Sequence, residues 1–121
     1  MKLVALSQRL DYLESRNELR EGVDQKLVSF LSFVGLTAIP ISNSYSEKTP
    51  PQTSGTPLDE LLNKVGFVGV VLSGGNDLGT YSARDHTELN LLNFAEKNNL
   101  PVLGICRGMQ LMAIRGKTTL H

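Results

Sequence analysis

The chain has 121 residues, and 12 Lys and Arg side chains balance 12 Asp and Glu side chains. Its length predicts one domain, and 40% apolar with 20% charged residues is typical of a globular protein rather than a disordered one. Zero net charge argues against nucleic-acid binding, and no apolar run approaches the ~18 residues that span a membrane. The single cysteine excludes an internal disulfide and a cysteine-based zinc site, and it fits a reducing cytoplasm.

The order of apolar runs and helical patterns predicts the fold class. Four runs have the length of buried strands: residues 2–7, 36–41, 67–72 and 101–105. Four segments have the three- and four-residue apolar spacing of helices: residues 17–34, 57–65, 89–98 and 108–114. The polar segments 8–16 and 43–56 are interpreted as irregular chain and an exposed loop. Alternation of strand and helix predicts an α/β protein with a doubly wound parallel sheet.

Several residues mark where these elements end or begin. Gly35 is expected to end the first helix, and Pro40 places the second strand at an edge of the sheet or near its own end. Thr56 is expected to cap the second helix. Asp85 and Glu88 have the spacing of a capping box, which would begin the third helix.

The only cysteine lies in the sequence Gly104-Ile105-Cys106-Arg107-Gly108, between a predicted strand and a predicted helix. Glycines two residues away on each side are typical of the tight turn that presents a nucleophile. The helix N-terminus and Arg107 would favour the thiolate form of the cysteine. The alternative is a buried, inert cysteine, which is common for this residue type.

A glycine pair follows the third predicted strand, in Ser73-Gly74-Gly75. Its backbone N–H groups could stabilise an oxyanion, and the alternative is a flexible turn. Gly75 and Cys106 each follow the carboxyl end of a predicted parallel strand, so they are expected at the same edge of the sheet. Ligands bind at that edge in parallel sheets. His86 could be a base, although a solvated histidine at a helix start is the more common case.

These motifs together resemble a known family. Residues 70–77, the residues Arg84, Asp85 and Glu88, and residues 100–110 closely resemble the class I glutamine amidotransferases, in particular their gamma-glutamyl hydrolase branch, peptidase C26. The specific part covers residues 67–112. The stretches 7–9 and 17–20 are similar to the start of the gamma-glutamyl-CDP-amidate hydrolases.

The resemblance implies a flavodoxin-like three-layer sandwich and a gamma-glutamyl small-molecule substrate. Cys106 would be the nucleophile that forms a gamma-glutamyl thioester, and the backbone N–H groups of Gly75 and Arg107 would form the oxyanion hole. Gly74 and Gln110 would bind the substrate. The resemblance implies no metal and no organic cofactor, and it leaves open a synthetase partner or a homodimer.

The chain also departs from the family pattern. The family places a His and a Glu, two residues apart, far downstream of the cysteine, and neither His86 nor His121 fits that position. Residues 1–121 are therefore predicted to be the N-terminal portion of a single domain, truncated after the helix that follows Cys106 and inactive alone. One alternative is a non-catalytic module that binds a gamma-glutamyl ligand or a partner. Another is a hydrolase of the dienelactone type, which leaves the Ser-Gly-Gly-Asn-Asp sequence unexplained.

Overall fold

A parallel sheet forms the centre of the computed structural model, which describes residues 1–47, 55–76 and 78–105. Its strands, within this described part, are β1 (Leu3–Leu6), β4 (Thr37–Pro40), β5 (Phe67–Leu72) and β6 (Val102–Gly104). They lie in the order β4-β1-β5-β6, and each neighbouring pair is parallel. The four predicted strands and their parallel arrangement are confirmed, and Pro40 ends a strand at the edge of this sheet.

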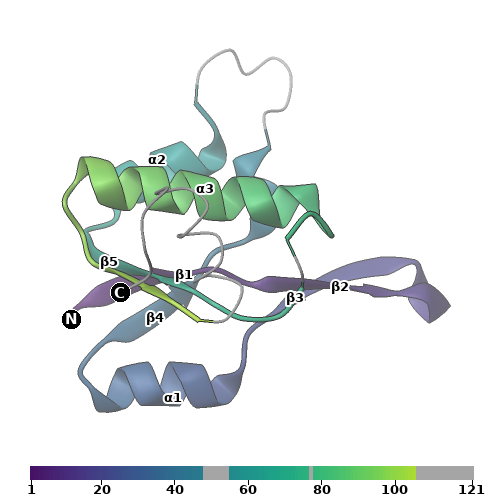
Figure 1. Ribbon diagram of the computed structural model, residues 1–121, viewed down its shortest axis with the longest axis horizontal. Helices are drawn as coiled ribbons and strands as arrows, with labels where there is room; N and C mark the ends of the chain where they lie inside the picture. The colour runs from purple at the N-terminus through teal and green to yellow at the C-terminus, as the bar shows by residue number, and fades with distance from the viewer. Residues whose placement is uncertain (48–54, 77, 106–121) are drawn as a thin grey trace.

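Helices cover both faces of the sheet, as the alternating pattern predicts (Figure 1). The helix α1 (Gln25–Phe33) lies on one face, and α2 (Pro57–Lys64) and α3 (Ser82–Lys97) lie on the other. The two central strands, β1 and β5, are apolar and largely buried because helices cover both faces of the sheet. In β5, for example, Val70 and Leu72 pack into the core under α2 and α3, whereas Val71 packs into the core under α1.

Local capping interactions fix the ends of α1 and α2. The α1 helix ends in a Schellman motif, in which the Leu36 N–H donates to the Leu31 carbonyl at 2.8 Å and Gly35 adopts φ +89°. Thr56 and Asp59 form a reciprocal capping box at the start of α2. The predicted roles of Gly35 and Thr56 are therefore confirmed.

The segment between β1 and α1 differs from the prediction. Residues 9–22 form an antiparallel hairpin of β2 (Arg9–Leu13) and β3 (Glu18–Gly22), joined by the short 3-10 helix η1 (Glu14–Arg16). The prediction of irregular chain followed by a helix from residue 17 is wrong for these residues. Asn17, at φ +47°, reverses the chain, and Asp24 caps a helix that begins only at Gln25.

Two further expectations need correction. The α3 helix begins at Ser82, so Asp85 lies in its first turn instead of capping it, and Glu88 is fully buried instead of completing a capping box. The predicted loop 43–56 begins with a 3-10 helix, η2 (Asn43–Ser46), whose Asn43 is buried. The predicted helix 108–114 lies outside the described residues. Among those described, no helix is both long and apolar enough to cross a membrane.

Candidate active site

A hollow of about 610 Å³ lies at the carboxyl ends of β5 and β6, where ligands bind in parallel sheets. Its lining comes from β2, from the end of β3 through the first turn of α1, from the glycine loop after β5 and from the residue after β6: Arg9, Asp11, Gly22, Val23, Asp24, Leu27, Ser73, Gly74, Gly75 and Ile105. The expectation that the two strand ends meet at one edge is met up to Ile105, whose N–H donates to the Leu72 carbonyl at 3.0 Å. Cys106, Arg107 and Gln110 lie outside the described residues.

The glycine loop, defined here as residues 73–76, has a backbone that suits its sequence. Gly75 adopts φ +86° and Asn76 adopts φ +51°, a left-handed region that glycine and asparagine tolerate better than other residues. Gly75 also lies against the Arg9 side chain, because a Cβ placed on Gly75 would approach Arg9 atoms to 3.3 Å. Both the conformation and the close approach therefore favour glycine at position 75.

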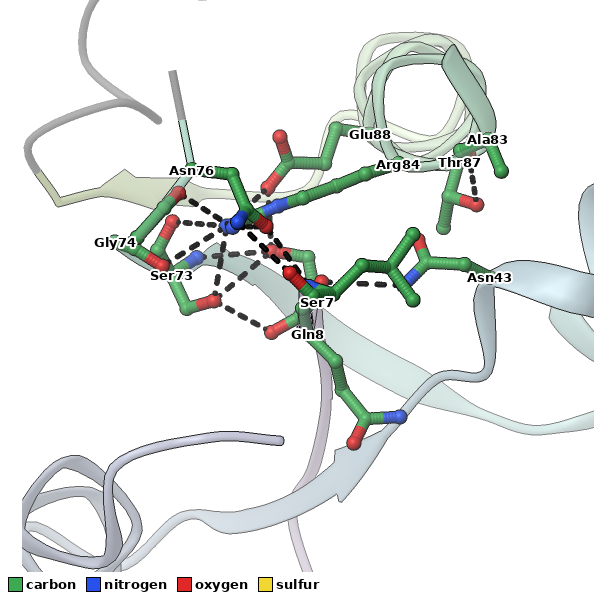
Figure 2. Close-up of polar contacts among 12 residues, drawn as sticks. Ser7, Gln8, Asn43, Ser73, Gly74, Asn76, Ala83, Arg84, Thr87 and Glu88 are labelled. Carbon is green, nitrogen blue, oxygen red and sulfur yellow. Dashed lines mark hydrogen bonds and ion pairs between the residues drawn. The ribbon is translucent and has the colours of Figure 1, made fainter. Parts of the chain in front are cut away.

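A buried arginine on α3, Arg84, binds the backbone of this loop (Figure 2). The Arg84 side chain is fully buried, and its Nη2 donates to the carbonyls of Ser73 at 2.7 Å and Gly74 at 3.1 Å. Its Nη1 donates to the Gly75 carbonyl at 2.5 Å and to Asn76 Oδ1 at 3.1 Å. One guanidinium thus binds three consecutive backbone carbonyls, which its fork of donors allows.

The bound carbonyls determine where the loop amides point. In a planar trans peptide, the C=O of one residue and the N–H of the next point in opposite directions. The N–H groups of Gly74, Gly75 and Asn76 therefore point away from Arg84. Arg84 is absent from the lining of the hollow, whereas Gly74 and Gly75 belong to it.

Glu88 contacts the guanidinium, and Ser7 in turn contacts Glu88 (Figure 2). Glu88 is fully buried one helical turn after Arg84, and its Oε2 lies 3.4 Å from Arg84 Nη2. The same oxygen accepts a hydrogen bond from Ser7 Oγ at 2.5 Å. Ser7 Oγ in turn accepts from the Ser73 N–H at 2.9 Å. The network joins the ends of β1 and β5 to α3, and the carboxylate balances the buried positive charge.

Asn76 attaches the β2–β3 hairpin to the glycine loop. Its Oδ1 accepts from the Leu10 N–H at 2.8 Å, and its Nδ2 donates to the Leu10 carbonyl at 2.9 Å, so its amide pairs with β2 as a neighbouring strand would. On the same strand, Arg9 Nη2 donates to Asp11 Oδ1 at 2.9 Å. The hairpin therefore forms a charged wall of the hollow, in a segment for which the sequence predicted no part in the site.

The roles of Arg84 and Glu88, which fix the glycine loop, were not predicted from the sequence. Arg84 and Glu88 belong to the stretches that carry the family resemblance, but Glu88 was assigned to a helix cap with Asp85, and Arg84 was given no role of its own. The signal that could have found them was their separation by four residues, which places them on one helix face. His86 is exposed and lines a different hollow beside Thr56 and Asn93, in line with a solvated histidine. The described residues contain no cluster of three His, Cys, Asp or Glu that could hold a metal.

Comparison with known proteins gives a consistent set of matches. Residues 48–121 match the profile of the Peptidase C26 family. The chain is 32% identical over 119 residues to the gamma-glutamyl-CDP-amidate hydrolase of Campylobacter jejuni, a match that covers 91% of this chain and 53% of that protein. It is 38% identical over 69 residues to one subunit of the glutamine-hydrolyzing GMP synthase of Methanocaldococcus jannaschii, covering 57% of this chain and 32% of that subunit. The chain thus spans about half or less of the length of these relatives.

Proposed function

The chain belongs to the peptidase C26 family, within the class I glutamine amidotransferases, and from this membership we propose that its protein hydrolyses gamma-glutamyl amide bonds with Cys106 as nucleophile. One observation supports the proposal above all. The glycine loop directs its amides away from Arg84 and lines the hollow together with Ile105, the residue just before Cys106. Fixed N–H groups beside a nucleophile are what acyl transfer requires.

The proposed reaction proceeds through two acyl transfers. The Cys106 thiolate attacks the gamma-carbonyl carbon, and the carbonyl π electrons move to its oxygen. The N–H groups of Gly75 and Arg107 stabilise this oxyanion. As the oxyanion collapses, the C–N bond breaks, and the amine leaves with a proton from a general acid. Water, deprotonated by a general base, then attacks the thioester, which yields glutamate and regenerates the thiolate.

The substrate class follows from the relatives and not from the hollow alone. The names of both relatives concern a gamma-glutamyl compound or glutamine, which is itself a gamma-glutamyl amide. We therefore assign a gamma-glutamyl small molecule as substrate, bound with contributions from Gly74 and Gln110. The Arg9–Asp11 pair and Asp24 place both charge signs on the wall of the hollow, which suits a zwitterionic amino acid.

The acceptor of the reaction is proposed to be water. The relative from Methanocaldococcus jannaschii is named as a subunit of a synthase, which makes a synthetase partner the alternative. In that case the released ammonia would be used by the partner. Glutamate release that proceeds at full rate without an added protein supports the hydrolase, whereas release that depends on a second subunit supports the partner role.

A binding module without turnover is the second candidate, and the position of His86 favours it for residues 1–121 taken alone. His86 lines a hollow other than the one beside the glycine loop, so it does not supply the general base there. If no other residue supplies that base, the protein would bind the ligand and at most form a thioester once. Multiple-turnover glutamate release by residues 1–121 would rule out this candidate and reveal a base elsewhere in the chain.

The nucleophile is tested in the full-length protein. Glutamate release from glutamine and from a panel of gamma-glutamyl amides would be measured for the unaltered protein, Cys106→Ser and the control His86→Gln. Cys106→Ser is expected to abolish release and the thioester detected by mass spectrometry, while substrate affinity stays within about threefold, because the serine hydroxyl is a much weaker nucleophile. His86→Gln is expected to retain the rate. Turnover retained in Cys106→Ser would refute the assignment.

A further inference from the structure

We infer that Arg84 is a positioning residue of the reaction, since it orients the peptide between Gly74 and Gly75 so that the Gly75 N–H faces the oxyanion. The inference rests on the proposed function. Arg84 Nη2 donates to the Gly74 carbonyl at 3.1 Å, and that carbonyl belongs to the same peptide plane as the Gly75 N–H. Fixing the carbonyl therefore fixes the direction of the amide.

The loop needs this restraint because of its own sequence. Two adjacent glycines have the widest choice of backbone conformations, and Gly75 occupies one, at φ +86°, that competes with many others. A donor that rotates freely loses the advantage of a preorganised oxyanion hole, which stabilises the transition state without reorganising. The contacts of Arg84 with Ser73, Gly74 and Gly75 replace that freedom with a single orientation.

Only an arginine satisfies the whole arrangement. The Gly75 carbonyl and Asn76 Oδ1 bind Nη1, whereas the carbonyls of Ser73 and Gly74 bind Nη2. Lysine carries the same charge on one nitrogen with three donors, so it cannot reach both groups of acceptors in this geometry.

Arg84 acts through the peptide and not through its own charge. Its side chain is fully buried and does not line the hollow, so it does not touch the substrate. Glu88, at 3.4 Å from Nη2 and also fully buried, balances the positive charge and holds the guanidinium in place. The inference thus predicts a loss in kcat that comes from a misdirected amide, with substrate binding largely retained.

The test compares variants of the full-length protein by kinetics and by NMR. Arg84→Lys is the main variant, and Glu88→Asp is the second, because it keeps both charges but withdraws the carboxylate by one methylene. Arg16→Lys, at an exposed position in η1, controls for the exchange of arginine for lysine. Thr56→Ala, which removes the cap of α2, controls for a general loss of stability. The readouts are kcat, KM, the rate of thioester formation and the amide resonances of Gly74 and Gly75.

Loss of one oxyanion donor lowers kcat by about 10²–10³-fold, so Arg84→Lys is expected to lose about 10²-fold in kcat with KM within threefold. Glu88→Asp is expected to lose about tenfold, and both are expected to shift the Gly75 amide resonance. Arg16→Lys and Thr56→Ala should change neither kcat nor that resonance. A kcat retained within threefold in a folded Arg84→Lys variant, or a loss matched by Thr56→Ala, would overturn the inference.

The NMR readout separates failure of this inference from failure of the proposed function. An unaltered protein that forms no thioester and releases no glutamate refutes the proposed function. In that case, an unchanged Gly75 amide resonance in Arg84→Lys or in Glu88→Asp also overturns the positioning role. A shifted resonance supports the claim that Arg84 orients the peptide between Gly74 and Gly75. Should Arg84→Lys fail to fold, Glu88→Asp carries the same two readouts.

Discussion

The buried ion pair between Arg84 and Glu88 has an exposed counterpart in the same chain, and the two allow a matched test of what burial contributes. Both pairs have their partners four residues apart on a helix. Arg84 and Glu88 are 0% exposed, whereas the side chains of Glu60 and Lys64 are 66% and 75% exposed. The perturbation is Glu88→Gln on α3 and Glu60→Gln on α2, each of which removes one negative charge and keeps the shape.

The expected losses of unfolding free energy differ about tenfold between the two variants. Removing one partner of a buried pair leaves an uncompensated charge, which costs about 3–5 kcal/mol of unfolding free energy. Glu88→Gln also weakens the hydrogen bond that Ser7 Oγ donates to the carboxylate at 2.5 Å. An exposed pair on a helix contributes only about 0.3–0.5 kcal/mol, because water already solvates both charges.

Urea unfolding of the full-length protein, followed by circular dichroism, measures both variants under the same conditions. With a slope of about 2 kcal/mol per molar urea, Glu88→Gln should lower the midpoint by about 1.5–2.5 M and Glu60→Gln by less than about 0.3 M. A Glu88→Gln midpoint within about 0.5 M of that of Glu60→Gln would refute the view that the buried charge network holds the glycine loop.

Three further predictions concern backbone conformation and capping. Gly75→Ala should lower the free energy of unfolding by about 1–2 kcal/mol because of its φ of +86°, and it should also reduce activity because its Cβ would meet Arg9. Gly79→Ala, at the same φ but with nothing within 4 Å of its Cβ, should lower only the free energy of unfolding. Equal activity of the two variants would contradict this prediction. Thr56→Ala should lower the free energy of unfolding by about 0.5–2 kcal/mol, and no change in the urea midpoint would argue against the capping box. Asn76→Gly should speed hydrogen exchange of the Leu10 amide, which donates to Asn76 Oδ1. Unchanged exchange would mean that contacts other than those of Asn76 attach the hairpin.

The sequence predicted the parallel sheet well because its signal is local and strong. Each strand is a short apolar run, and residues such as Gly35 and Thr56 mark helix ends through interactions with their immediate neighbours. The alternation of strands and helices then leaves few topologies. The observed order β4-β1-β5-β6 is one of them.

The β2–β3 hairpin could not be predicted in the same way. All five residues of β3 are exposed or only half-buried, and its Leu19 is 52% exposed, so burial imposes no alternating pattern on the strand. The four-residue spacing from Leu19 to Val23 and Leu27 coincides with a helical period by chance. What fixes the hairpin is the turn at Asn17 and the pairing of Asn76 with β2, and the second is a contact between distant segments.

The site was predictable in part. The position of the glycine loop at the edge of the sheet followed from motif and topology. The roles of Gly74, Gly75, Cys106, Arg107 and Gln110 stay predictions. Arg84 and Glu88 could not be placed by spacing, because a charged residue near a helix start is usually solvated or a cap. Their burial depends on carbonyls of the glycine loop and on Ser7, which lies 81 residues from Glu88.

The long separation of these contacts along the sequence affects the order in which parts of the protein fold. Ser7 bonds to Ser73 and to Glu88 across 66 and 81 residues, and Leu10 bonds to Asn76 across 66. During synthesis, the glycine loop leaves the ribosome before the helix that carries Arg84 and Glu88. The loop therefore lacks the partners of its carbonyls until α3 has been made and has docked on the sheet. Non-local contacts of this kind form slowly, so the glycine loop is expected to be among the last parts of the described fold to acquire its native geometry.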